Sequence, residues 1–480
     1  ERSCLRDLRG LDGAAYGVQR RRHVRRWAGR WRRADIAIDG PEEDQQAVRF
    51  AVFQLVGACP PRDPTVGIAA KGLTGPGYRG HVFWDTEVFM LPHFTWTHPG
   101  SARRILDYRY LNLPGARRKA AAKGYAGAMF PWESADTGDE ACPDFVPDPI
   151  TGRPVRVLTG QLQHHIAADV AYGCREYIAA TGDNRYRERR GLVLAVETAR
   201  FWASRVQHDP ASGRYEIRDV IGPDEYHEHV DNNAYTNFMA AWNLRHAADE
   251  VERMRAAHPR SRLLRQLDVG TEEVAFWRTA AQSLALPDPD ESGLIEQYDG
   301  FFRLLQGDPE ALSSRVSTEP EAERMARVHR CQILKQPDVL MVMAMFPGRY
   351  DEATVRRNWD YYEPRTTHDS SLSPCVHSIV ASDLGLADRA YEYFRRSARV
   401  DLDDINGNTD SGLHCAALGG TWQAVMRGFL GLRPGRNGPT VRPALPPAWR
   451  SVRTQVSFRG RWLTIEADRE RATVRPAGRR

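Results

Sequence analysis

The feature that most constrains this chain is a recurring alternation. From about Gln46 to Leu432, apolar segments at helical spacing follow short loops rich in Gly, Pro, Asp and aromatic residues. In residues 234–254, for example, one face of the predicted helix is apolar and the other carries Arg, Asp and Glu. The residues that could carry chemistry gather in six loops, each before a helix-like segment. Six such loops predict six helical hairpins, and a closed ring of hairpins presents its loops around one central pocket.

The C-terminal residues follow a different pattern, that of a β-hairpin. Residues Val452 to Phe458 lead to Gly460, and polar and apolar residues alternate from Trp462 to Ala467. We therefore expect a mainly α fold over residues 41–432 and a small β-sheet domain over residues 433–480.

The charge balance does not favour a polyanionic partner. Lys and Arg total 67 against 62 Asp and Glu, a formal charge of +5, so no nucleic acid is expected. The basic cluster Arg20 to Arg33, with Trp27 and Trp31 interleaved, is compatible with phosphate-backbone or membrane-surface contact. Its spacing also fits a solvated helix with two buried tryptophans, which we favour because no recognition motif accompanies the charge.

Cysteine spacing and hydropathy indicate a cytoplasmic protein without a membrane partner. The seven cysteines include no C-x-x-C pair, which is typical of neither a disulfide framework nor a zinc site, so no metal is expected. The longest apolar stretch, Val339 to Phe346, is too short to span a bilayer, and the start at Glu1 lacks the apolar core of a signal peptide. That start also lacks a methionine, which suggests a truncated N-terminus.

Two loops pair a tryptophan with an acid. Trp84 precedes Asp85, and Trp132 precedes Glu133. A tryptophan can stack on a pyranose face while a neighbouring carboxylate accepts hydrogen bonds from hydroxyl groups. A single tryptophan is more often a core residue, but two such pairs in loops favour sugar binding.

The third loop, residues 222–228, carries a dense acidic cluster that includes Glu225 and leads into a helix beginning near Asn233. Crowded carboxylates repel one another's charges, so one of them can stay protonated near neutral pH and act as a general acid. The alternative is a helix cap whose acids complement the helix dipole.

The remaining three loops are rich in cations, amides and hydroxyls. Lys335 and Gln336 precede a buried helix, whereas His368, Ser370 and Ser371 combine an imidazole with hydroxyls that suit an oxyanion. A Gly-Gly pair that includes Gly420 is expected to form a flexible turn whose N–H groups point at the same anion. Each loop taken alone could also be ordinary loop and cap chemistry.

Taken together, these motifs closely resemble glycoside hydrolase family 65, the family of the maltose, trehalose and kojibiose phosphorylases. The resemblance runs from about Asp35 to Leu432. The order of the motifs is far more specific than any one of them. They are F-W-D-T-E, F-P-W-E-S-A, G-P-D-E-Y-H-E with D-N-N-A-Y-T-N, K-Q-x-D-V, Y-Y-E-P with H-D-S-S-L-S-P, and G-G-T-W.

The resemblance implies an (α/α)6 barrel with a C-terminal β domain and an inverting phosphorolysis that releases β-glucose 1-phosphate from an α-glucoside. Glu225 resembles the general acid of that family. The residues implied to hold glucose are Trp84, Asp85, Trp132, Glu133, Lys335 and Gln336. Those implied to hold phosphate are His368, Ser370, Ser371 and Gly420.

One acid suffices for phosphorolysis, because phosphate is already an anionic nucleophile. We therefore expect no cofactor and only a disaccharide and phosphate as ligands; the resemblance also suggests a homodimer. An inverting hydrolase would need a second carboxylate to activate water. In the family's hydrolytic members a glutamate matches His368, so the histidine favours phosphorolysis, whereas Asp369 keeps hydrolysis open.

Two departures from the family leave questions open. Members of full length carry a β-sandwich before a helical linker, and residues 1–40 resemble that linker alone. The loop from Asp139 to Val157 is a variant that does not indicate whether the substrate is trehalose, maltose, kojibiose or a related sugar. A non-catalytic carbohydrate-binding protein is the alternative from another class.

Overall fold

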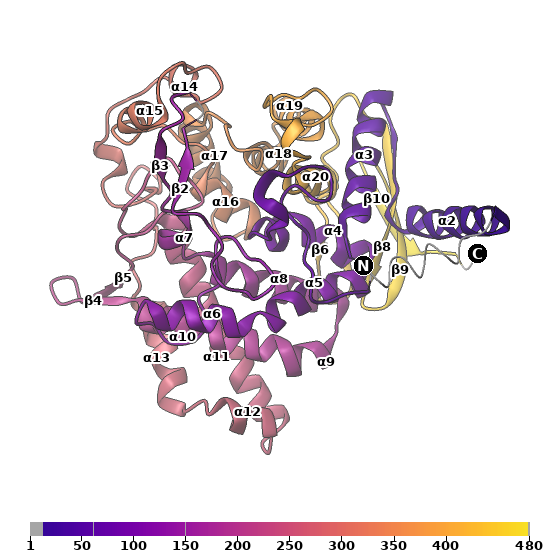
Figure 1. The fold of residues 1–480 in the computed structure, drawn as a ribbon. Coiled ribbons are helices and arrows are strands. Elements are labelled where there is room, and N and C mark those ends of the chain that lie inside the picture. The colour runs from indigo at the N-terminus through magenta and orange to yellow at the C-terminus, as the bar shows by residue number, and fades with distance from the viewer. Residues whose placement is uncertain (1–12, 61, 149, 479–480) are drawn as a thin grey trace.

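Six helices form the inner wall of the molecule (Figure 1). The computed structural model describes residues 13–60, 62–148 and 150–478, and within them each inner helix packs against the next and the last against the first. Every residue of α16 and α20 is buried, as expected for helices that are covered on all sides. The inner helices are α4 (Leu91–Thr97) preceded by the π-helical turn η2 (Thr86–Met90), α8 (Ile166–Thr181), α11 (Ala234–Ala257), α16 (Asp338–Met345), α18 (Ser373–Asp383) and α20 (Cys415–Gln423) continued by η7 (Ala424–Phe429).

Six outer helices cover this ring. Helix α3 packs on α20, α5 on α4, α10 and α13 on α11, α17 on α16, and α19 on α18. In α19, Tyr393 and Phe394 are buried while Arg389 and Glu392 are exposed, as the amphipathic pattern requires. The outer helices are α3 (Glu42–Ala58), α5 (Pro99–Leu111), α10 (Leu192–Arg205), α13 (Thr271–Ser283), α17 (Glu352–Tyr362) and α19 (Ala387–Arg399). The predicted ring of six hairpins, an (α/α)6 barrel, is thereby confirmed.

Shorter helices lie in the connections between the inner and outer helices. They are η1 (Gly77–Gly80), α6 (Leu113–Ala122), α7 (Thr159–Leu162), α9 (Asn184–Tyr186), η3 (Arg187–Gly191), α12 (Arg262–Leu267), η4 (Phe301–Arg303), α14 (Pro309–Leu312), α15 (Glu321–Val328), η5 (Glu363–Arg365) and η6 (Thr409–Ser411). No helix in the described parts of the chain is both long enough and apolar enough to cross a bilayer.

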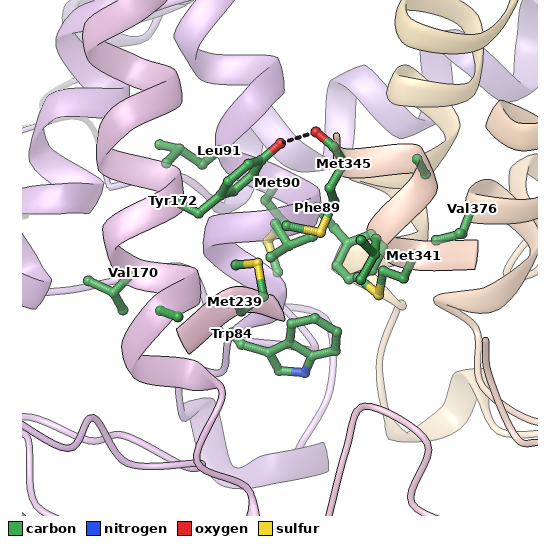
Figure 2. Packing of buried hydrophobic residues seen from close by; sticks show 14 of the residues in the cluster. Trp84, Phe89, Met90, Leu91, Val170, Tyr172, Met239, Met341, Met345 and Val376 are labelled. Carbon is green, nitrogen blue, oxygen red and sulfur yellow. Dashed lines mark hydrogen bonds between the residues drawn. The ribbon is translucent and has the colours of Figure 1, made fainter. Parts of the chain in front are cut away.

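The axis of the barrel is filled with apolar side chains from different inner helices (Figure 2). Met239 of α11 and Met341 and Met345 of α16 meet Phe89 of η2 there. Unbranched methionine side chains fill such irregular space well. Tyr172 of α8 donates a hydrogen bond of 3.2 Å to the Met345 carbonyl, so its buried hydroxyl has a partner. The barrel interior is therefore a packed floor below the loops.

The C-terminal domain is a four-stranded antiparallel sheet in the order β1-β8-β9-β10. The predicted hairpin is confirmed by β8 (Ser451–Phe458) and β9 (Arg461–Asp468), which pair with Phe458 opposite Arg461. The connecting residues Arg459 and Gly460 have φ of 46° and 77°, the left-handed values of a two-residue hairpin loop. The remaining strands are β10 (Ala472–Pro476) and the short pairs β2 (Phe145–Pro147) with β3 (Pro154–Arg156), β4 (Gln207–Asp209) with β5 (Arg214–Glu216), and β6 (Arg433–Pro434) with β7 (Pro439–Thr440).

The N-terminal segment joins this sheet. Residues 1–12, part of the expected linker, lie outside the described residues. Helix α2 (Gly13–Ala34) extends away from the barrel (Figure 1), and Trp27 stacks on Phe53 of α3 at 4.8 Å between ring centroids. Strand β1 (Ile36–Asp39), which the sequence did not predict, pairs with β8, with Ile36 opposite Thr454. The Trp449 indole also donates to Asp44 of α3 over 2.7 Å, so residues far apart in the chain meet beside the barrel.

Candidate active site

A cavity of about 840 Å³ lies among the loops that precede the inner helices. Four inner helices, α11, α16, α18 and α20, begin directly after loops that line it, and helix N-termini favour negatively charged ligands. The cavity brings together most of the residues singled out from the sequence. They are Trp84, Asp85, Trp132, Glu133, Glu225, Lys335, Gln336, Ser370 and Ser371.

The Trp84–Asp85 wall is held by a buried ion pair. Arg109 of α5 donates from Nε and Nη2 to the two carboxylate oxygens of Glu87 over 2.9 and 2.8 Å, and Nη2 also donates to the Phe83 carbonyl over 2.9 Å. Both side chains of this pair are 0% exposed. Trp84 packs edge-on against His165 and is fully buried, so it forms inner wall rather than an exposed stacking platform.

Asp85 lies in a site that favours its neutral form. Burial raises the pKa of Asp85 to about 7, and the negative charge of Glu225 adds to the rise. Unlike an ordinary aspartate, Asp85 can therefore donate as well as accept a hydrogen bond near neutral pH.

This raised pKa predicts a pH-dependent stability. The unfolded chain ionises Asp85 near its ordinary pKa, whereas the folded protein does so only near pH 7, so stability is lost as the pH rises toward 7. We expect the free energy of unfolding of Asp85→Asn, measured by urea denaturation, to increase relative to that of the wild type as the pH rises from 5 to 7. The difference should grow by up to roughly 1.4 kcal/mol per pH unit. The difference should level off above pH 7. A difference that does not change with pH would contradict the raised pKa.

The Trp132–Glu133 wall is organised by a second acid. Glu140 accepts from the backbone N–H groups of Trp132 and Glu133 over 2.9 and 3.0 Å, and it receives the Lys119 ammonium at 2.5 Å. Glu133 itself pairs with Nδ1 of His81 at 2.7 Å. The backbone of this loop is therefore fixed, and the Glu133 carboxylate is oriented from the first loop.

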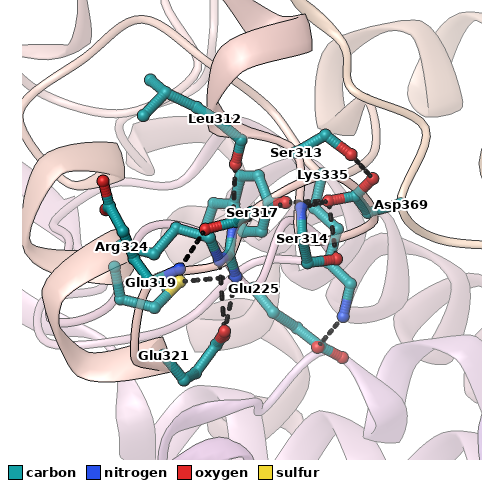
Figure 3. Close-up of polar contacts among 12 residues, drawn as sticks. Glu225, Leu312, Ser313, Ser314, Ser317, Glu319, Glu321, Arg324, Lys335 and Asp369 are labelled. Atoms are coloured by element: carbon teal, nitrogen blue, oxygen red, sulfur yellow. Dashed lines mark hydrogen bonds and ion pairs between the residues drawn. The ribbon is translucent and has the colours of Figure 1, made fainter. Parts of the chain in front are cut away.

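The general-acid candidate contacts a lysine. Nζ of Lys335 donates to Glu225 over 2.6 Å, and both side chains line the cavity (Figure 3). Burial lowers the pKa of Lys335, but the charge and hydrogen bond of Glu225 outweigh it, so the pKa is raised overall. Two predicted site residues, 110 positions apart, thus form one ionic unit.

Two buried aspartates fix the backbone around this pair. Asp224 accepts from the Lys335 N–H over 2.9 Å, and Asp338 accepts from the Asp224 N–H over 2.8 Å. Burial raises the pKa of both carboxyls, most strongly that of Asp338, which also faces Asp224. Gly222 has no room for a side chain, because a Cβ atom there would overlap Asp338 and Asn233. The loop of residues 222–228, called the acid loop below, and the loop that contains Lys335 therefore form one rigid wall.

Another part of the cavity wall is cationic and rich in hydroxyls. Lys71 and His414 line it together with Ser370 and Ser371. Nζ of Lys71 lies 3.0 Å from Nε2 of His414, and Nδ1 of His414 lies 2.6 Å from the buried Asp401 carboxylate. Burial lowers the pKa of Lys71, partly offset by the charge of Asp401. These groups suit an oxyanion.

Sequence reasoning missed Lys71 and did not select His414. Lys71 lies in an irregular segment without a motif, so only its position in the fold reveals it. His414 belongs to the sixth loop, and its signal was available: a polar residue directly before the buried helix α20.

The structure does not bring His368 to the cavity surface. Its ring is buried, with Nδ1 2.8 Å from the Ser373 hydroxyl and Nε2 3.2 Å from the Tyr393 hydroxyl. Burial holds the pKa of His368 well below its ordinary value. A φ of 56° places His368 in the left-handed region. In place of the expected contact with the anion, His368 contacts Ser373 and Tyr393, on the side of the loop away from the cavity.

Gly420 lies within helix α20 and not in the expected turn. A Cβ atom at Gly420 would lie 2.5 Å from Sγ of Cys375 in α18, and one at Gly419 would overlap the backbone of Phe89. The glycine pair therefore allows close packing of inner helices. Its N–H groups belong to the helix, and Gly420 does not line the cavity.

The closed (α/α)6 barrel and its cavity of aromatic and acidic side chains define an α/α-barrel protein with a concave site suited to a polar, ring-shaped ligand. The chain matches the glycosyl hydrolase family 65 central catalytic domain over residues 49–423 and the C-terminal domain of the same family over residues 432–478. It belongs to glycosyl hydrolase family 65.

Several phosphorylases are similar to this chain. A kojibiose phosphorylase of Halothermothrix orenii is 42% identical over 455 residues, which cover 94% of this chain and 58% of that protein. An alpha,alpha-trehalose phosphorylase of Thermoanaerobacter brockii is 38% identical over 92% of this chain and 55% of that protein. The chain thus spans little more than half the length of these relatives. A solved structure of a candidate kojibiose phosphorylase from the human microbiome superposes with a TM-score of 0.86 at 29% identity, covering 100% of this chain and 68% of that one.

Proposed function

We propose that the protein is an inverting disaccharide phosphorylase that cleaves an α-glucoside with inorganic phosphate, and that kojibiose is its substrate. The observation that carries the proposal is that one cavity holds both the Glu225–Lys335 pair and the oxyanion-suited set of Lys71, His414, Ser370 and Ser371. The names of the relatives support it, because kojibiose phosphorylases are among the chains with the highest identity.

In this reaction Glu225 gives its proton to the glycosidic oxygen as the bond from that oxygen to C1 breaks. A phosphate oxygen forms the new bond to C1 from the other face of the ring, so the configuration inverts and β-glucose 1-phosphate is released with glucose. The nucleophile is already an anion, so no second carboxylate is needed to deprotonate it. The reaction therefore needs no cofactor besides phosphate.

Lys335 can interact with both the acid and the substrate. With no sugar bound, its ammonium donates to Glu225. Sugar hydroxyls entering the cavity can accept from that ammonium in place of Glu225. Lys335 can therefore hold the sugar beside the acid.

The test is product analysis with purified protein and a panel of kojibiose, trehalose, maltose and nigerose, each with and without phosphate. We expect phosphate-dependent β-glucose 1-phosphate from kojibiose. Glucose release that ignores phosphate would establish a hydrolase instead. Sugar binding without turnover of any of the four would indicate a carbohydrate-binding protein.

We infer further that the enzyme acts in the cytoplasm and that it forms a homodimer. The scattered cysteines support the reducing compartment. Gel filtration with light scattering tests the dimer, and a monomer at micromolar concentration would contradict it.

A further inference from the structure

Asp369 is a carboxylate directly before Ser370 and Ser371, which we call the anion loop, and its surroundings argue against the role of a hydrolytic base. It lines the cavity. Its Oδ1 accepts from the Ser313 hydroxyl over 2.5 Å and pairs with Nε of Arg315 at 3.3 Å. Its Oδ2 accepts from the N–H and hydroxyl of Ser314 over 2.6 and 2.8 Å (Figure 3).

A fourth hydrogen bond joins Asp369 to the acid loop (residues 222–228). The hydroxyl of Tyr226, the residue after Glu225, also donates to Oδ2. That hydroxyl in turn accepts from the buried Arg324 over 3.1 Å, and the Arg324 guanidinium lies over the Tyr226 ring, 5.1 Å from its centroid. Arg324 is itself held by the Leu312 carbonyl at 3.0 Å (Figure 3). The contact between Tyr226 and Asp369 is therefore fixed from both ends.

The same carboxylate sits next to a strained turn. His368 is a non-glycine residue with a φ of 56°, a conformation that persists only where surrounding contacts enforce it. Arg315 donates to the carbonyls of Thr367 and His368 over 2.7 and 3.3 Å while it pairs with Asp369. Arg315 thus holds three successive residues, Thr367 to Asp369. Ser370 and Ser371 follow them directly in the chain.

We propose that Asp369 is a positioning residue, which fixes the anion loop against both the acid loop and the turn at Ser313–Arg315, and that it is not a base. This inference rests on the proposed function for its choice of phosphate as the anion. Four hydrogen bonds and one ion pair on two oxygens leave no lone pair directed at an attacking water. Burial alone would raise the pKa of Asp369, but the hydrogen bonds of Ser313, Tyr226 and Ser314 outweigh it and lower the pKa, which makes a weak base.

The test compares Asp369→Asn with the wild type by the dependence of rate on phosphate and on disaccharide. An asparagine directs its own N–H groups at some of the four hydrogen-bond donors and loses the charge that pairs with Arg315, so the loop should shift. We expect the KM for phosphate to rise about tenfold, the effect of roughly one lost charge-assisted hydrogen bond, and the KM for the disaccharide to stay within about twofold. Asp360→Asn, on the exposed face of α17, is the matched control and should change neither. An unchanged phosphate KM in Asp369→Asn would overturn the proposal.

Two further measurements cover the remaining cases. If Asp369→Asn does not fold, Tyr226→Phe removes one donor and keeps the ring, and it should raise the phosphate KM about threefold; no rise would overturn the proposal. If the wild type releases glucose without phosphate, the proposed function has failed, and sodium azide added to Asp369→Ala then decides. Azide is an anionic nucleophile that can attack C1 in place of base-activated water, forming a C1–N bond as the leaving sugar departs. Restored turnover with formation of β-glucosyl azide in Asp369→Ala, but not in the wild type, would identify Asp369 as the base, whereas no restoration supports positioning.

Discussion

Glu225→Gln is expected to lower kcat for kojibiose phosphorolysis by about 10²- to 10⁴-fold, the usual contribution of a positioned general acid. The amide keeps the size of the side chain, but its N–H protons are too weakly acidic to be transferred. Its oxygen can still accept from Lys335, which lies 2.6 Å from the carboxylate, so glucose binding measured by calorimetry should change little.

The same variant can be tested with a leaving group that needs no proton. With α-glucosyl fluoride and phosphate, Glu225→Gln should lose far less activity than with the disaccharide, because fluoride departs without protonation. Glu228→Gln is the matched control: it lies in the same loop, does not line the cavity and should leave kcat unchanged. Equal losses on both substrates would show that Glu225 positions the substrate and does not act as the acid.

Arg109→Met is expected to lower the free energy of unfolding by about 3–5 kcal/mol, the cost of leaving one partner of a buried ion pair uncompensated. Both Arg109 and Glu87 have side chains that are 0% exposed. The loss should appear as a lower urea midpoint, and because Glu87 lies two residues beyond Asp85, glucose affinity should fall as well.

The control pair lies on the surface. Arg118 contacts Asp139 at 2.7 Å with side chains that are 57% and 46% exposed, so Arg118→Met should cost no more than about 1 kcal/mol. Adding Glu87→Leu to Arg109→Met removes the buried charge and should recover much of the lost stability. If the double variant is as unstable as Arg109→Met alone, the loss comes from packing and not from the unpaired charge.

The sequence predicted those site residues that stand in loops before buried helices. Trp84, Trp132, Glu225 and Lys335 all meet in one cavity, because a closed ring of hairpins brings its loops to one end. It could not predict that Trp84 would be fully buried, since a tryptophan in a loop has the same sequence signal whether it faces a ligand or the core.

Two predictions of the anion site depended on backbone geometry that the sequence does not encode locally. A Gly-Gly pair can form a turn or allow two helices to approach closely, and Gly420 does the latter because Cys375 lies against it. His368 takes a left-handed φ, which Arg315 helps to hold from a different part of the chain. Strand β1 also depends on a distant part of the chain. Its four residues form a strand because they pair with the edge of β8, more than 400 positions later.

Closure of the ring has a consequence for how the protein is made. Helix α3 packs on α20, and its Asp44 accepts from Trp449, 405 residues further along. At a synthesis rate of roughly 5–20 residues per second, α3 is complete about 20–80 s before Trp449 is added. For most of that interval, until α20 (Cys415–Gln423) is made, Val48, Val52 and Leu55, all buried in the finished barrel, have no α20 to cover them. The nascent chain therefore exposes an apolar helix face until α20 has been synthesised, which is the kind of surface that chaperones bind.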